Sequence, residues 1–91
     1  MKLSLTRQAS RELESLDAKQ SRQVTLKVIG LLKNPEPHDS SLLTGSKHGE
    51  RRVDLGEYRA IYAIHNDSVE VVVIGKRNDD DVYNIWKRQQ W

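Results

Sequence analysis

The sequence has no cysteine, only two prolines and only five glycines among its 91 residues. Without cysteine there is no disulfide framework and no thiolate metal site, which fits a small domain in a reducing cytoplasm. The chain also lacks an apolar run long enough to cross a bilayer, and its first residues lack the apolar core of a signal peptide. We therefore expect a soluble, cytoplasmic protein with no membrane partner.

The sequence also has little net charge, formally +2 at pH 7. This excess permits binding to nucleic acid without requiring it, because strongly basic nucleic-acid-binding domains usually carry more. The cations of the second half fall on or beside predicted strands: Lys47, Arg51, Arg52, Arg59, Lys76 and Arg77. Asp79-Asp80-Asp81 follows directly, and we expect this acidic run to weaken a basic patch.

The first third of the chain predicts a short strand and a two-helix hairpin. Leu3 and Leu5 alternate with polar residues, and Thr6 can then cap a helix with apolar residues at helical spacing, namely Ala9, Leu13 and Leu16. Asp17 with Gln20 resembles a capping box before a second apolar stripe that Asn34-Pro35 ends. Residues 34–50 contain both prolines and two glycines, so we expect a loop there, anchored by Leu42 and Leu43.

The next segment predicts an antiparallel meander of strands near 51–55, 58–65 and 68–75. Gly56-Glu57 suits a type II′ turn, and Asn66-Asp67 suits a second tight turn. A two-residue turn at Gly56-Glu57 pairs Asp54 with Arg59 and Arg52 with Ile61, and paired residues share a face. One face then carries apolar residues, and the opposite face carries Arg52, Asp54, Arg59 and Ile61.

The fold class that follows is α+β in a single domain of residues 1–91, because shorter halves would bury too little apolar surface. The helix hairpin should cover the apolar face of the meander. The run from Val69 to Ile74 predicts a strand buried on both faces. A C-terminal helical segment with Val82, Ile85 and Trp86 on one side is available to cover the second face and to bring Tyr83 over the arginines.

Three motifs in this order resemble those of a known family. They are Leu43-Thr44-Gly45, then Gly56-Glu57-Tyr58-Arg59-Ala60-Ile61-Tyr62, and then Gly75-Lys76-Arg77 followed by Val82-Tyr83. The chain as a whole resembles the RelE toxins of bacterial type II toxin–antitoxin systems. The Gly-Glu-Tyr-Arg and Gly-Lys-Arg motifs are shared with the wider RelE/ParE superfamily, which includes gyrase-poisoning ParE toxins. The tyrosine six residues after Arg77 favours RelE.

The resemblance implies a ribosome-dependent endoribonuclease that cleaves messenger RNA and is silenced by a cognate antitoxin. It implies catalytic roles for Arg59, Arg77 and Tyr83. Arg52 matches a lysine of the family's first meander strand, whereas Asp54 departs from the pattern because the family has a second lysine there. Arg51 and Lys76, which are adjacent in sequence to these residues, complete the substrate-binding candidates. No metal or cofactor is expected.

The chemistry follows from the residues as well. Cleavage of RNA by its own 2′-hydroxyl needs a base, cations that hold the phosphate, and an acid for the leaving 5′-oxygen. The sequence has no carboxylate–histidine cluster at ligand spacing, which leaves a metal-free route open. Tyr83 would be the base, because guanidinium groups favour the phenolate. Arg52 and Arg59 would clamp the phosphate, and Arg77 would stabilise the leaving oxygen.

Several alternatives stay open at this level. Arg59 opposite Asp54 is by itself typical of a surface ion pair. Trp86 and Trp91 either stack on bases or pack against the sheet or an antitoxin helix. The three histidines fall in loops or turns and should be exposed, at positions 38, 48 and 65. The rival functions are a ParE-like protein that binds gyrase without nuclease activity, and a degenerate relative that only binds an antitoxin.

Overall fold

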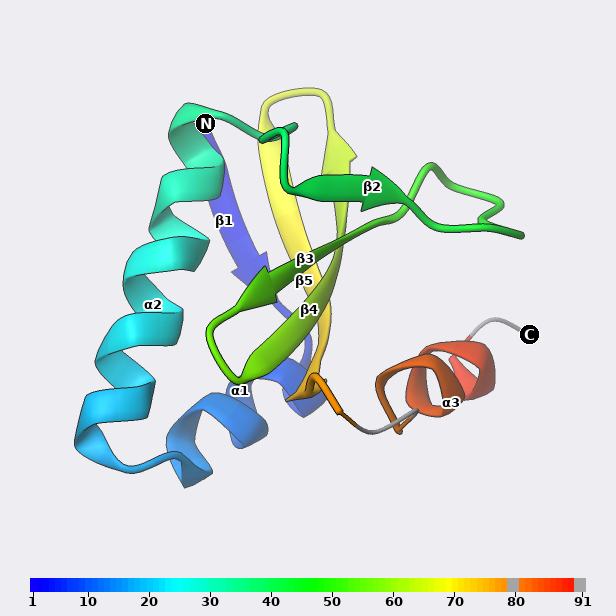
Figure 1. The fold of residues 1–91 in the computed structure, drawn as a ribbon. Helices are drawn as coiled ribbons and strands as arrows, with labels where there is room; N and C mark the ends of the chain where they lie inside the picture. Colours follow the sequence, from blue (N-terminus) through cyan, green and yellow to red (C-terminus); the bar gives the residue numbers. More distant parts are fainter. Residues whose placement is uncertain (79–80, 90–91) are drawn as a thin grey trace.

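The computed structural model describes residues 1–78 and 81–89, with only the backbone of Asp81. These residues form one five-stranded sheet with helices on both faces (Figure 1). The elements in chain order are β1 (Lys2–Leu5), α1 (Arg7–Ser15), α2 (Ala18–Lys33), β2 (Ser40–Leu42), β3 (Arg51–Leu55), β4 (Tyr58–His65), β5 (Ser68–Lys76) and α3 (Asp81–Arg88). The predicted α+β class is confirmed. In the described part of the chain, no helix is long and apolar enough to cross a membrane.

The helix hairpin begins and ends at the predicted residues. The Thr6 hydroxyl oxygen accepts a hydrogen bond from the Ala9 amide at 3.3 Å, and the Asp17 carboxylate accepts one from the Gln20 amide at 2.8 Å. Both side chains therefore satisfy amide groups that the first turn of a helix leaves without a partner. The second helix ends at Lys33, and the following Asn34 precedes a proline, which disfavours helical backbone.

The sheet has the strand order β1-β5-β4-β3-β2, in which β1 runs parallel to β5 and all other pairs are antiparallel. The predicted register across the first turn is confirmed, since Asp54 pairs with Arg59 and Arg52 with Ile61. Gly56 has φ of 73°, as the first central residue of a type II′ turn requires. Asn66, in the second turn, is left-handed with φ of 47°.

One element was missed by the sequence prediction. Residues 40–42, expected to belong to a loop, form the short edge strand β2 against β3. Their backbone groups form hydrogen bonds with β3, which its hairpin with β4 already holds in place. Strand β2 can therefore form without a strand-like pattern in its own three residues. Leu43, directly after β2, is buried at 6% exposure and anchors the segment as predicted, whereas Leu42 is 62% exposed.

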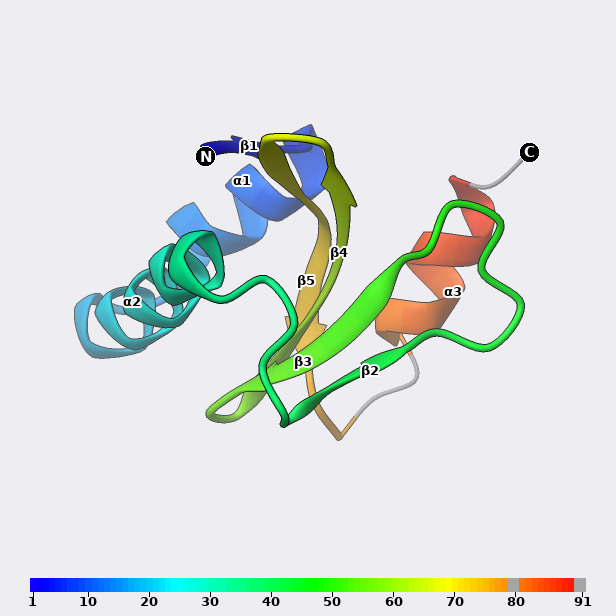
Figure 2. The same ribbon diagram turned by 90° about the horizontal axis from the view of Figure 1, so that it is seen from above.

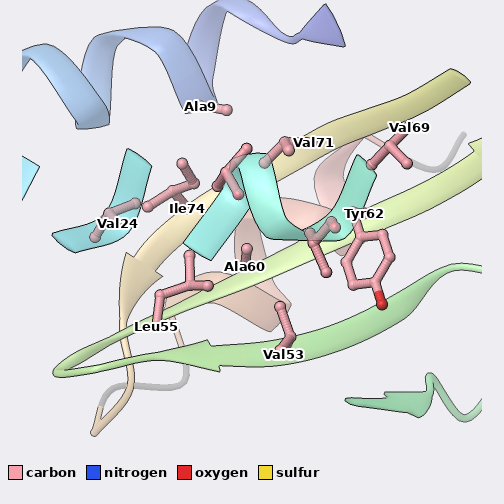
Figure 3. Close-up of a cluster of buried hydrophobic side chains, with 11 residues drawn as sticks. Ala9, Val24, Val53, Leu55, Ala60, Tyr62, Val69, Val71 and Ile74 are labelled. Carbon is pink, nitrogen blue, oxygen red and sulfur yellow. The ribbon is translucent and has the colours of Figure 1, made fainter. Parts of the chain in front are cut away.

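Two apolar clusters hold the layers together. The larger one lies between the helix hairpin and the sheet, where Ala9 and Val24 face Leu55, Ala60 and Tyr62 (Figure 3). The smaller one lies on the opposite face under α3, as Figure 2 shows by the position of that helix across the sheet from α1 and α2. Its buried members are Leu43, Ile61, Val73, Val82 and Trp86. The prediction that the C-terminal segment covers the second face is confirmed.

Strand β5 contributes to both clusters, as its apolar run predicts, but with an irregular register. Ile61 pairs with Val73 while Tyr62 pairs with Val71, so Val72 is an extra residue opposite β4. Such a bulge turns successive side chains toward the same face. Val72 and Val73 therefore both contact the cluster under α3.

Candidate active site between the sheet and helix α3

Helix α3 packs directly on β5 because Gly75 has no side chain. A Cβ atom at Gly75 would lie 2.7 Å from Cγ2 of Val82, closer than two carbon atoms approach without a shift. Val82 is fully buried in the cluster under the helix, and Tyr83 follows it as a half-buried residue. The close approach of α3 therefore fixes where Tyr83 meets the sheet.

Tyr83 meets two arginines from neighbouring strands. Arg52 of β3 donates from Nη1 to the Tyr83 hydroxyl oxygen at 2.7 Å, and Arg59 of β4 donates from Nη1 to the same oxygen at 2.9 Å. The Arg59 guanidinium also lies over the tyrosine ring, with Cζ 5.8 Å from the ring centroid, which is a cation–π contact. Two cations and a phenol thus form one group, called here the Tyr83 centre.

Each arginine of the centre is held by its Nε atom. Arg52 Nε donates to the hydroxyl of Ser41 at 3.0 Å, and Arg59 Nε donates to the Asp54 carboxylate at 2.8 Å. The contact between Asp54 and Arg59 agrees with their predicted pairing across the two strands. Ser41 was missed because it belongs to β2, the strand that the sequence did not reveal.

Asp54 also sets the charge of the centre. Its hydrogen bond raises the pKa of Arg59 above the ordinary arginine value; burial opposes this, and Tyr83 adds a smaller raising contribution. The Arg59 side chain is 18% exposed and that of Asp54 is 44% exposed, so solvent screens their attraction. Arg59 therefore stays a cation at neutral pH, next to one carboxylate.

The other predicted cations lie away from the Tyr83 centre. Arg51 belongs to the opposite face of β3, because side chains alternate along a strand, and it contacts Ser40 at 3.1 Å and Glu36 at 3.5 Å. Lys76 and Arg77 are exposed and line a separate hollow at the end of β5. The structure thus brings together Arg52, Arg59 and Tyr83, whereas the remaining candidates lie apart from them.

The sequence of residues 3–81 matches the family described as the ParE toxin of the type II toxin–antitoxin system parDE. The chain belongs to this toxin family. The predicted membership of the RelE/ParE superfamily is thereby confirmed. A search of curated proteins gives no match.

Solved toxin structures have the same fold as this ParE-family chain. A mutant of the E. coli toxin RelE in the free state has a TM-score of 0.78 at 21% identity, covering 99% of this chain and 97% of that chain. RelE in the archaeal RelE–RelB complex from Pyrococcus horikoshii has a TM-score of 0.74 at 23% identity, covering 85% and 94%. The YoeB/ParE toxin from Agrobacterium tumefaciens has a TM-score of 0.73 at 19% identity, covering 85% and 99%. At these identities the likeness shows the fold and not the activity.

In this ParE-family chain a buried carboxylate ties α3 to the loop before β3. Glu50 is 3% exposed, and its Oε1 accepts hydrogen bonds from the Ser46 hydroxyl and from the His48 amide at 3.1 Å. Its Oε2 lies 3.5 Å from Nε1 of Trp86. Trp86 packs in the cluster under α3 at 5% exposure, which confirms the alternative that it packs against the sheet. No local pattern distinguishes Glu50 from the exposed charged residues around it, so sequence reasoning missed this link.

The remaining predicted features of the toxin have simple outcomes. All three histidines are exposed, as expected. Among residues 1–78 and 81–89, no group of three or more histidine, cysteine, aspartate or glutamate side chains is placed to hold a metal ion. Of the acidic run, Asp79, Asp80 and the side chain of Asp81 lie outside the described residues, as does Trp91.

Proposed function

We propose that this chain is a toxin that cleaves messenger RNA on the ribosome. The observation that carries the proposal is the Tyr83 centre, in which Arg52 and Arg59 both donate to one phenol oxygen, at 2.7 and 2.9 Å. Within the described residues neither arginine uses its Nη2 atom in a hydrogen bond. Those donors are therefore available to a phosphodiester that approaches the tyrosine.

The proposed reaction is attack of the RNA 2′-hydroxyl on its adjacent phosphorus. Tyr83 removes the proton of the attacking hydroxyl, with the guanidinium groups of Arg52 and Arg59 hydrogen-bonded to its oxygen. The bond from O2′ to phosphorus forms as the bond from phosphorus to O5′ breaks. The leaving O5′ takes a proton from solvent water, so the products are a 2′,3′-cyclic phosphate and a 5′-hydroxyl. Negative charge that grows on the phosphate oxygens is stabilised by Arg52 and Arg59. This route requires no metal ion.

Arg77 is proposed to stabilise the leaving 5′-oxygen, directly or through water. It is exposed, and it follows Gly75, the strand partner of Arg59, by two residues. Lys76 and Arg51 are proposed to attract the RNA backbone at longer range, Lys76 from the end of β5 and Arg51 from the opposite face of β3. These three assignments rest on the resemblance to RelE together with the position of each cation on β3 or at the end of β5.

The ribosome is proposed to present the messenger RNA. A formal charge of +2 releases few counterions on RNA binding, so unaided affinity for free RNA should be low. The proposed place of action is the cytoplasm, where ribosomes translate. The proposed regulator is a cognate antitoxin, because the chain belongs to a toxin–antitoxin family and the archaeal RelE of similar fold was solved in complex with RelB.

A second candidate is inhibition of gyrase without RNA cleavage, and it is favoured by the ParE description of the matched family. Primer extension on one messenger RNA, incubated with purified toxin in the presence and absence of ribosomes, separates the two. Cuts within codons only when ribosomes are present are the expected result. Intact RNA together with gyrase-dependent DNA breaks would replace the proposal with the second candidate. If neither occurs while an antitoxin still binds, the chain is a degenerate relative.

A further inference from the structure

The loop before β3 is folded around one buried carboxylate. Oε1 of Glu50 accepts from the Ser46 hydroxyl and from the His48 amide, and the Glu50 amide donates to the Ser46 hydroxyl oxygen at 2.6 Å. The Glu50 carbonyl accepts from the Leu43 amide at 2.9 Å, and Leu43 is buried in the cluster under α3. Glu50 therefore holds the segment 43–50 in a fixed position beside the helix.

Two neighbouring links join this part of the chain to α3. Oε2 of Glu50 lies 3.5 Å from Nε1 of Trp86, which is a long hydrogen bond. Two residues after Glu50, Arg52 donates to the Tyr83 hydroxyl oxygen at 2.7 Å. Trp86 follows Tyr83 by three residues, so the two side chains lie on the same face of α3. A helix that is held at two neighbouring points on one face cannot turn about its axis without breaking one of them.

The hydrogen bonds of the Glu50 carboxylate give it a direction. A hydroxyl, a backbone amide and an indole N–H all donate to it, and an ionised carboxylate can only accept. Burying a carboxylate costs free energy even where it is hydrogen-bonded, and an apolar side chain of similar size could fill the same space. What the carboxylate adds is therefore the orientation that it imposes on Trp86.

We propose that Glu50 is a positioning residue for the Tyr83 centre. By accepting from Trp86 it fixes the rotation of α3, and this rotation aims the Tyr83 hydroxyl at the two arginines. The close approach at Gly75 sets how near the helix comes to the sheet, whereas Glu50 sets which way the helix faces. The inference rests on the proposed function where cleavage is the readout, but the orientation of Tyr83 can be measured without cleavage.

The orientation is tested by ¹⁹F NMR of the full chain labelled with 3-fluorotyrosine at its three tyrosines. Tyr83→Phe assigns the Tyr83 signal by removing it. Glu50→Gln keeps the size of the side chain but adds an NH₂ group, which in either orientation faces an N–H donor of the loop or of Trp86. The Tyr83 signal should therefore shift.

The other two tyrosines are internal controls. Tyr58 and Tyr62 contact the cluster on the opposite face of the sheet, so their signals should stay in place. Glu14→Gln makes the same chemical change at an exposed glutamate of α1 and should move none of the three signals. An unmoved Tyr83 signal in Glu50→Gln, or equal shifts of all three signals, would overturn the inference.

Cleavage of messenger RNA on ribosomes is the second readout. At saturating ribosomes Glu50→Gln should lower the single-turnover rate by about 10- to 100-fold, as expected for a reacting group displaced by up to about 1 Å, with unchanged affinity for the ribosome. Trp86→Phe keeps an aromatic ring and removes the N–H group. It should slow cleavage by about 2- to 12-fold, which corresponds to one ordinary hydrogen bond. An unchanged rate in Trp86→Phe would overturn the inference even if Glu50→Gln does not fold.

The double variant separates positioning from a general loss of stability. Once Trp86→Phe has removed the indole N–H, the amide of Glu50→Gln meets no donor on the helix, so the double variant should cleave faster than Glu50→Gln alone. A double variant slower than either single variant would show that the effects are only structural. A chain that cleaves messenger RNA with an unmoved Tyr83 signal refutes only this inference, whereas a shifted signal without cleavage on ribosomes refutes only the proposed reaction.

Discussion

The same chemical change at two tyrosines should have opposite consequences. Tyr83→Phe and Tyr62→Phe each remove one hydroxyl and keep the ring. The Tyr83 oxygen accepts from two guanidinium groups at 2.7 and 2.9 Å, in a half-buried position. The Tyr62 hydroxyl is on a fully buried side chain on the opposite face of the sheet and donates to the Pro35 carbonyl at 2.7 Å.

The magnitudes follow from these surroundings. In Tyr83→Phe the Nη1 atoms of Arg52 and Arg59 donate to water instead of to the phenol oxygen, and their Nε atoms keep their partners. The free energy of unfolding should therefore change by no more than ~0.5 kcal/mol. Loss of the proposed base should lower the cleavage rate by about 10²- to 10⁴-fold. In Tyr62→Phe the Pro35 carbonyl loses a partly buried donor, which costs about 1–3 kcal/mol. For a domain of this size each 1 kcal/mol lowers the melting temperature by about 4–8 °C.

The assay combines thermal melts with single-turnover cleavage of messenger RNA on ribosomes, measured well below the melting temperature of the less stable variant. The expected pattern is an inactive, stable Tyr83→Phe and an active, less stable Tyr62→Phe. If Tyr83→Phe cleaves at the rate of the unmodified chain, Tyr83 is structural and the base lies elsewhere. If both variants lose activity in proportion to stability, the loss reflects unfolding and the assignment of Tyr83 fails.

Three further predictions test the surroundings of the centre. Arg77→Ala should slow cleavage by about 10²- to 10³-fold. Arg7→Ala changes another exposed arginine and should leave the rate unchanged. Equal losses in the single-turnover rates of the two variants would show that Arg77 is not part of the site. Asp54→Asn should bind RNA–ribosome complexes more tightly and cleave faster, most clearly at low salt, because a fixed carboxylate competes with phosphate; slower cleavage with an intact circular dichroism spectrum would make Asp54 an orienting partner. Gly75→Ala should displace α3, destabilise the fold by about 1–3 kcal/mol and abolish cleavage. Gly30→Ala should have none of these effects, because an added Cβ there meets nothing within 4 Å. Unchanged melting temperatures in both variants would contradict the close packing of Gly75 on Val82.

The sequence was sufficient for features that depend on near neighbours along the chain. The helix starts at Thr6 and Asp17 follow from side chains that reach amides three residues away. The register of β3 with β4 follows from a two-residue turn at Gly56, because the turn leaves one way to pair the flanking residues. The same register puts Asp54 directly beside Arg59, so this contact of the candidate site could be predicted from local pairing.

The sequence was less informative where an element depends on partners far along the chain. Strand β2 has only three residues and forms because β3 offers an edge to pair with. The bulge at Val72 depends on the fit of β5 to β4 and to the cluster under α3, which a pattern of continuous valines does not encode. Glu50 resembles any exposed glutamate until the loop folds around it.

The amino-acid sequence alone specifies which groups could do chemistry: two strand arginines on one face, a tyrosine on a C-terminal helix, and motifs of a toxin family. The convergence of Arg52, Arg59 and Tyr83 on one oxygen, while Arg51 and Arg77 lie apart, is a property of the folded molecule. Local pairing fixes the face on which a side chain lies. The distance between a strand and a helix is instead set by packing, here by Val82 seated against the bare backbone of Gly75.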